Sequence, residues 1–174
     1  DGSLIAFGKA RAGDENPVLS VLNVTTGQTL PDQVRGTRQK ICSWLPDNSG
    51  FYYTAKPVRG EVPEGEEQYW HAVYLHKLGT PASADVKALG HDTVKEYYHW
   101  VIVQENGQHV VYYRISNDKN EVLLGTIDSE GPLVPLARGF DAEYSVYVVE
   151  DKIFIVTDRN APKRMVLVTD VSRP

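Results

Sequence analysis

Cysteine and histidine are scarce in this chain, which excludes several kinds of site. The 174 residues include one cysteine and five histidines. The single thiol of Cys42 cannot form an intrachain disulfide or a multi-cysteine zinc site, and its apolar neighbours predict a buried thiol. His71 and His76 lie five apart on a predicted strand, which sends them to opposite faces. The others are widely spread, at His91, His99 and His109. We therefore predict no metal site and no cofactor site.

Long hydrophobic runs and an excess of positive charge are also missing. No apolar stretch approaches the roughly 20 residues of a membrane-spanning helix, and the first residues, Asp1-Gly2-Ser3, lack the features of a signal peptide. The formal net charge is −5, with lysine and arginine scattered along the chain, which disfavours a phosphate backbone as ligand. We expect neither a membrane nor nucleic acid as a partner. The sequence leaves cytoplasm and periplasm both open.

The nucleophile elbow Gly-x-Ser-x-Gly is absent as well. In α/β-hydrolases this motif presents the nucleophilic serine on a strained strand-to-helix turn. Ser20, Ser43 and Ser145 lie instead within predicted strands. We predict no catalytic residue in this chain.

The chain does contain short apolar stretches that are rich in Val, Ile, Tyr and Phe. They are separated by Gly, Asn, Asp and Pro. No segment keeps a helical apolar stripe over three turns, so the sequence predicts an all-β fold. A turn followed by an apolar strand recurs four times, with turns at Gly2, Gly50, Gly107 and Asp151. The spacings of 48, 57 and 44 residues are close to the roughly 40–50 residues of a four-stranded propeller blade.

These repeats predict a single partial β-propeller of about four four-stranded antiparallel blades. The modules cover approximately residues 1–36, 37–90, 91–139 and 140–174. Strands are predicted before the last three turns, at 41–45, 100–103 and 144–149, whereas the first module lacks one and the last lacks a fourth strand. The first and last blades are thus expected to be incomplete. Open ends expose edge strands and apolar faces, so we expect self-association.

Several polar segments have a simple structural interpretation. The acidic, proline-containing stretch 56–68 is predicted to be a solvated loop. Asn117–Glu121 lacks the glycine and the closing glutamate of a calcium loop and predicts a hairpin loop. The sequon at Asn23 falls at a strand end and is interpreted as incidental. Charged residues of the last module predict either an ion-pair cluster or exposed turn charges, at Asp141, Glu143, Asp158 and Arg159.

Three segments resemble blades of prolyl oligopeptidase-type serine peptidases and occur in that family's order. They are Ser43–Asp47 with Gly50–Tyr53, Tyr74–Val86 with its Leu-Gly-Thr turn, and Thr157–Pro162 with Arg164 and Val166–Asp170. The resemblance covers nearly the whole chain. It implies that the Ser/Asp/His triad belongs to a separate α/β-hydrolase domain, which this chain does not contain.

The family's propeller also offers an aromatic side chain and a thiol to the substrate, and this sequence departs at both. The position five residues before Trp44 is Gln39, and the loop after 110–113 holds Asn117 and Asp118. No substrate-contact role is therefore carried over to this chain.

The resemblance implies the substrate-gating part of a serine-type endopeptidase that cleaves short peptides after proline. Its partners would be the hydrolase domain of the same parent chain and short proline-containing peptides. The alternative is a stand-alone propeller scaffold or binding module without peptidase activity. A sugar-binding β-sandwich ranks last, because Trp44, Trp70 and Trp100 lie within or beside apolar strands.

Overall fold

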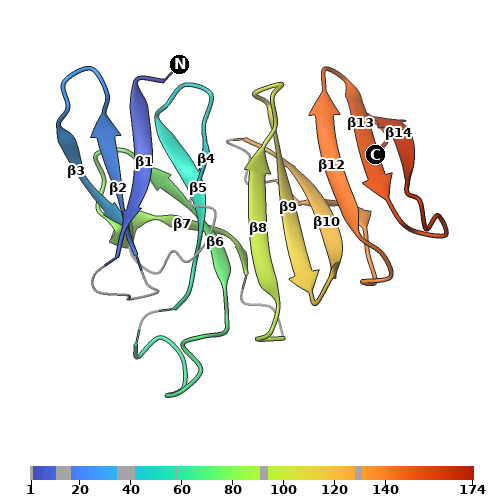
Figure 1. Ribbon diagram of the computed structural model, residues 1–174, viewed down its shortest axis with the longest axis horizontal. Coiled ribbons are helices and arrows are strands. Elements are labelled where there is room, and N and C mark those ends of the chain that lie inside the picture. Colours follow the sequence, from blue (N-terminus) through green and yellow to red (C-terminus); the bar gives the residue numbers. More distant parts are fainter. Residues whose placement is uncertain (1, 11–16, 35–41, 58, 91–93, 128–130) are drawn as a thin grey trace. The chain divides into compact units, whose positions relative to one another are not determined.

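Antiparallel sheets account for nearly all regular structure in this chain. The computed structural model describes residues 2–10, 17–34, 42–57, 59–90, 94–127 and 131–174. These residues contain 14 strands and one short 3-10 helix. The strands form four sheets, and within each sheet every strand pairs with its neighbours in sequence (Figure 1). The predicted all-β, partial-propeller fold is confirmed, with three strands in the first and last sheets and four in the middle two.

The chain divides into two compact units, Asp1–Glu96 and Tyr97–Pro174. Unit 1 holds sheet 1, which consists of β1 (Leu4–Lys9), β2 (Val18–Asn23) and β3 (Thr29–Val34). It also holds sheet 2, which consists of β4 (Ser43–Trp44), β5 (Gly50–Ala55), β6 (Ala72–Lys77) and β7 (Val86–Gly90), with the 3-10 helix η1 (Ala82–Ala84) before β7. A cluster of buried residues joins the two sheets: Leu19, Val21 and Val34 from sheet 1, and Phe51, Tyr53 and Ala55 from sheet 2.

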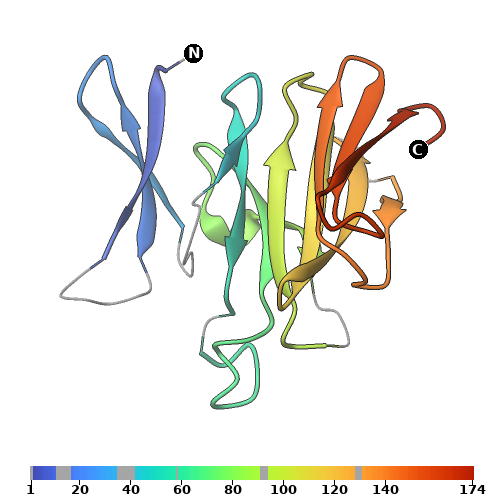
Figure 2. The same ribbon diagram turned by 45° about the vertical axis from the view of Figure 1, so that its right-hand side comes forward.

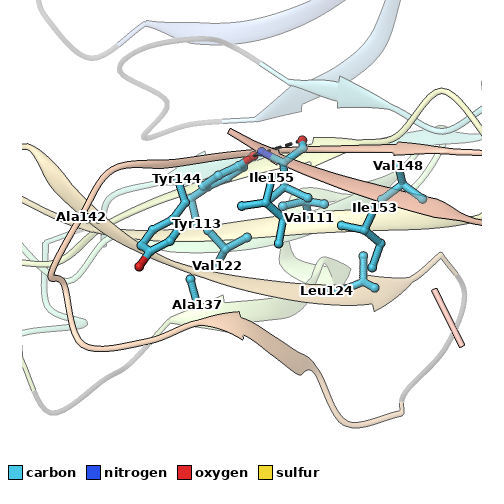
Figure 3. Packing of buried hydrophobic residues seen from close by; sticks show 11 residues of the cluster. Val111, Tyr113, Val122, Leu124, Ala137, Ala142, Tyr144, Val148, Ile153 and Ile155 are labelled. Carbon is cyan, nitrogen blue, oxygen red and sulfur yellow. Dashed lines mark hydrogen bonds between the residues drawn. The ribbon is translucent and has the colours of Figure 1, made fainter. Parts of the chain in front are cut away.

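Unit 2 has the same construction from two sheets. Sheet 3 consists of β8 (Tyr98–Val103), β9 (His109–Ser116), β10 (Lys119–Thr126) and β11 (Val134–Ala137). Sheet 4 consists of β12 (Tyr144–Val149), β13 (Lys152–Thr157) and β14 (Met165–Asp170), coloured orange to red in Figure 2. Their shared core is drawn in Figure 3, where side chains of β9 and β10 meet those of β12 and β13.

Strand burial follows from position within each unit. All six residues of β5 are buried, and its sequence is apolar or aromatic apart from Gly50 and Thr54. In β12, Tyr144, Val146 and Val148 are buried and alternate with more exposed residues, as expected for a strand with one packed face. Gly50 starts β5 where no side chain fits, since a Cβ would lie 2.2 Å from the carbonyl oxygen of His76.

Some predicted strand limits were wrong, for identifiable reasons. The predicted strand 41–45 is only Ser43–Trp44, with Ile41 outside the described residues. A short fourth strand expected around Thr29 and Leu30 in the first module is β3, which continues through Pro31 to Val34, because proline is tolerated where a strand lies at a sheet edge. Asn120 and Glu121 belong to β10 rather than to a hairpin loop, which is confined to Asn117 and Asp118.

The polar segment 56–68 is exposed at its tip and anchored at its base. Residues 59–61 and 63–65 are exposed, whereas Lys56 is buried and donates to Gln68 Oε1. Glu66 accepts hydrogen bonds from Trp70 Nε1 at 2.8 Å and Lys95 Nζ at 2.6 Å. In the part of the chain described, no helix is long and apolar enough to cross a membrane.

Candidate functional site

The side chains considered as nucleophiles all lie in or beside strands. Ser20 is in β2, Ser43 in β4 and Ser145 in β12. Cys42 precedes β4, is partly rather than fully buried, and packs against the unit 1 core. Burial raises the pKa of the Cys42 thiol to about 11, so it is almost entirely protonated at neutral pH.

The histidines are dispersed among different elements. His71 precedes β6, His99 lies in β8 and His109 begins β9, whereas His91 falls outside the described residues. Among residues the structure describes, no group of three or more His, Cys, Asp or Glu side chains could hold a metal ion.

The charged residues of sheet 4 form separate pairs. Arg159 Nε lies 2.9 Å from Asp141 Oδ2, while Glu143 pairs with Arg164 at 2.6 Å. Asp158 accepts from Lys119 Nζ at 3.0 Å and from the backbone N–H of Glu143 at 2.8 Å, and both bonds lower the pKa of its carboxyl group. These exposed pairs stabilise local turns by small amounts.

A buried network of ionisable side chains lies where sheets 1 and 2 of unit 1 meet. His76 Nδ1 is 2.8 Å from Asp85 Oδ1, and His76 Nε2 is 3.2 Å from Asp32 Oδ1. Asp32 comes from β3 of sheet 1, whereas His76 and Asp85 belong to sheet 2 and the segment before β7. The three side chains are at most 2% exposed. We call these residues the Asp–His–Asp triad.

Two further donors complete the triad. The backbone N–H of Gly79 donates to Asp32 Oδ1 at 2.6 Å, and the Tyr53 hydroxyl donates to Asp85 Oδ2 at 2.8 Å. Burial, followed by the hydrogen bond to Asp85, raises the pKa of the Tyr53 phenol well above its usual range. The phenol therefore remains a donor at all ordinary pH values.

A small hollow of about 300 Å³ lies beside this network in unit 1. Its lining includes Gln33, Tyr53, Lys56, Glu61, Tyr74 and Ser83. The Tyr53 and Tyr74 rings stack at 5.6 Å, and the Lys87 ammonium lies 5.7 Å from the Tyr74 ring centroid. Burial raises the pKa of Tyr74 and lowers that of Lys87. The hollow thus combines aromatic faces with one cationic and one anionic side chain in its lining.

The buried polar contacts between the two sheets of unit 2 use neutral side chains. Along β12, the backbone N–H groups of Tyr144, Val146 and Val148 bond to side chains of the preceding sheet and its turn. Their partners are Asn120 Oδ1 at 2.7 Å, the Tyr113 hydroxyl at 3.0 Å and Gln104 Oε1 at 2.8 Å. Asn120 Nδ2 also donates to the Tyr144 carbonyl at 2.8 Å. We call Gln104, Tyr113 and Asn120 the β12 anchors.

A second hollow, about 860 Å³ in volume, lies at the turns of unit 2 and is wide open to solvent. Glu105, His109, Glu150 and Asp151 contribute to its lining. His109 is bonded through Nδ1 to Asn106 Nδ2 at 2.8 Å, and burial lowers the pKa of the imidazole. A neutral histidine held by an amide has a structural role here.

Sequence reasoning missed the buried polar contacts between the sheets of both units, which we call the joints. His76 was considered only as a metal ligand, although a histidine in the middle of an apolar strand signals a buried polar group that requires partners. Those partners, nine and 44 residues away, gave no local signal. Of the positions weighed for substrate contact, Gln39 lies outside the described residues, and Asn117 and Asp118 form the β9–β10 turn.

Comparison with known proteins agrees with this architecture. The family described as "Prolyl oligopeptidase, N-terminal beta-propeller domain" matches residues 1–174. The chain belongs to this family. The predicted resemblance is thereby confirmed.

Curated relatives of this prolyl oligopeptidase family are considerably longer than the chain. A prolyl endopeptidase of Elizabethkingia meningoseptica is 27% identical over 177 residues, which cover 99% of this chain and 25% of the relative. Prolyl oligopeptidase A of Amanita bisporigera is 27% identical over 163 residues, covering 83% and 21%. The chain therefore spans about a quarter of the length of these relatives.

Solved structures of this family share the fold. A structure from a study of two prolyl endopeptidases and their inter-domain dynamics matches all of this chain and 26% of its own, with a TM-score of 0.91 and 24% identity. Prolyl oligopeptidase B from Galerina marginata, bound to a 35mer hydrolysis and macrocyclization substrate, matches 99% of this chain and 27% of its own, with a TM-score of 0.89 and 20% identity.

Proposed function

We propose that this chain is the substrate-gating portion of a serine-type endopeptidase that cleaves short peptides after proline. The observation that carries the proposal is the match of the prolyl oligopeptidase N-terminal propeller family over residues 1–174. The absence of a nucleophile elbow from the sequence supports a non-catalytic role for this portion. Bond cleavage would fall to a hydrolase domain elsewhere in the parent protein.

In that parent, an activated serine attacks the peptide carbonyl, a histidine acts as general base, and preorganised donors stabilise the oxyanion. The propeller contributes enclosure: it admits short, unfolded peptides and excludes folded proteins. Gating of this kind requires sheets that stay packed against one another, which makes the buried contacts between sheets the relevant structural features of this chain.

The experiment compares the 174-residue chain with its full-length parent on a short peptide containing one internal proline. We expect turnover by the parent and none by the chain alone. The parent should not cleave the same peptide sequence inserted in a loop of a folded protein. Turnover by the chain alone, or equal cleavage of both substrates by the parent, would contradict the proposal.

The alternative is a propeller that serves as a scaffold or binding module without peptidase activity. It is equally compatible with the missing nucleophile elbow, and propeller folds host many unrelated functions. Reading the coding sequence beyond Pro174 separates the two functions. A hydrolase domain with a nucleophile elbow supports the peptidase, and a stop codon supports the scaffold.

We further propose that the isolated chain self-associates through sheet 4. Tyr147, Val166 and Val168 are 57%, 59% and 56% exposed, and such apolar surface favours association. Sedimentation of the chain at increasing concentration should show growing oligomers, and Val166→Lys with Val168→Lys should reduce them. A monomer at all concentrations would contradict this.

A further inference from the structure

The Asp–His–Asp triad in unit 1 has an unusual combination of charge and burial. The His76 side chain is 0% exposed, and those of Asp32 and Asp85 are 2% and 1% exposed. The Phe51 ring lies 5.2 Å from the imidazole and forms part of its apolar surroundings. Water cannot compensate these groups, so their hydrogen bonds with one another decide where the protons lie.

Counting donors and acceptors determines the arrangement. An ionised carboxylate can only accept, so a ring nitrogen facing one must carry a proton. Nδ1 faces Asp85 at 2.8 Å and Nε2 faces Asp32 at 3.2 Å, which requires a donor on both sides of the ring. A neutral imidazole between two carboxylates would oppose a nitrogen lone pair to an anionic oxygen.

The remaining contacts of the two carboxyl groups are hydrogen bonds that they accept. Asp32 Oδ1 also accepts from the Gly79 N–H, and Asp85 Oδ2 accepts from the Tyr53 hydroxyl. These are the titratable and backbone groups that reach the triad from β3, β5, β6 and the segment before β7. All of them donate toward the two carboxylates, as charge-assisted hydrogen bonds favour.

We propose that His76 is an imidazolium ion with a proton on each ring nitrogen, and that it clamps sheet 1 to sheet 2 between the carboxylates of Asp32 and Asp85. Asp32 is the sheet 1 partner, and its carboxylate accepts two donors from sheet 2, His76 Nε2 and the Gly79 N–H. The clamp is therefore an ionic contact across the joint. Its burial protects it from screening by salt.

The chain provides a direct test through the ring nitrogens of its own histidines. In a 15N-labelled sample at about neutral pH, we expect both His76 ring nitrogens to resonate as protonated, with ring N–H protons that exchange slowly. His109 is the internal control: its Nδ1 accepts from Asn106 and burial lowers its pKa, so it should show one unprotonated nitrogen. One unprotonated nitrogen in His76 would overturn the proposal.

Asp85→Asn tests whether the carboxylates set this charge state. An amide at position 85 can accept from the Tyr53 hydroxyl while donating to His76 Nδ1, so each hydrogen bond retains a partner. We expect the variant to fold, with Nδ1 of His76 changing from protonated to unprotonated while Nε2 keeps its proton. Unchanged double protonation in a folded variant would show that the Asp85 carboxylate does not set the charge of His76 and would overturn its part in the clamp, and if the variant does not fold the spectrum of the unaltered chain still decides.

This inference does not depend on peptidase activity. The nuclear magnetic resonance measurement uses the chain alone, whereas the proposed gating function is tested with peptide substrates and the parent protein. Either result can fail while the other stands.

Discussion

Units 1 and 2 are built from the same pair of packed sheets but hold those sheets together differently. In unit 1 the polar part of the joint is ionic, centred on His76 between Asp32 and Asp85. In unit 2 its buried contacts are neutral, with Gln104, Tyr113 and Asn120 bonded to the backbone of β12, and the ion pair between the sheets, Lys119–Asp158, is partly exposed. The same pair of packed sheets can therefore be linked by three charged side chains, as in unit 1, or by two amides and a phenol, as in unit 2.

The difference follows from the length of the strand at the joint. β12 has six residues, and the N–H groups of every second one need partners outside its own sheet. β4 has only two residues and offers few such groups. Unit 1 instead uses side-chain-to-side-chain contacts from β3 and β6. An edge strand whose N–H groups are bonded to side chains is also protected from pairing with a foreign strand.

The largest effect should come from removing the cation of unit 1. His76→Ala leaves two buried carboxylates facing each other without a counter-charge, which should cost about 3–5 kcal/mol of unfolding free energy. Hydrogen exchange read by mass spectrometry should rise throughout β3, β5 and β6. The matched control is His109→Ala, which removes a neutral histidine from unit 2 and should cost distinctly less. Equal effects of the two substitutions would contradict the ionic clamp.

The corresponding break in unit 2 is Asn120→Ala. It removes the side chain that bonds both the N–H and the carbonyl of Tyr144. At about 1–3 kcal/mol for each unsatisfied buried group, the loss should be about 3 kcal/mol. Amide exchange at Tyr144 should accelerate while unit 1 is unaffected.

Asn120→Asp is the sharper comparison, because a carboxylate keeps the acceptor for the Tyr144 N–H and replaces the donor to the Tyr144 carbonyl with a second acceptor oxygen. Protection of the Tyr144 amide should therefore survive in this variant. If both substitutions expose that amide equally, Asn120 does not act through the paired bonds described here.

The local sequence pattern was enough to predict much of the fold, but it predicted almost none of the buried polar contacts between the sheets. The strand 144–149 and the spacing of the four turns are visible in sequence, since alternation and turn residues act over a few positions. Asp32 and His76 are 44 residues apart, and only the packing of two sheets brings them together. Asn120 was predicted to be a loop residue because it is polar, but its amide bonds to Tyr144 of β12 instead of to solvent. The local sequence is the same for both roles, so it could not distinguish them.

Alkaline pH should weaken unit 2 through Tyr113. Burial raises the pKa of this phenol to about 12, against about 10 in an unfolded chain. Its contribution is fully present below about pH 10 and is lost as pH rises through about 12, because the unfolded chain releases the proton first. The loss should be about 2–3 kcal/mol at the top of this range.

Tyr113→Phe isolates this contribution from other groups that titrate there. Urea unfolding at about pH 9 and about pH 12 should show a smaller fall for the variant than for the unaltered chain. Parallel falls would mean that Tyr113 is not protected by burial. The Tyr53 phenol of unit 1, whose pKa is raised by burial and by bonding to Asp85, should ionise later than that of Tyr113.

The smallest expected effect concerns the last of the β12 anchors. Gln104→Met preserves the length of the side chain and removes the acceptor for the Val148 N–H, which lies 2.8 Å from Gln104 Oε1. The cost should be about 1–2 kcal/mol, since one buried donor loses its partner. Exchange should accelerate at the Val148 amide and remain slow at Tyr144, because the Asn120 bonds persist. Acceleration along the whole of β12 would instead mean that the anchors act as one cooperative unit, which would bring the neutral joint of unit 2 closer in behaviour to the triad of unit 1.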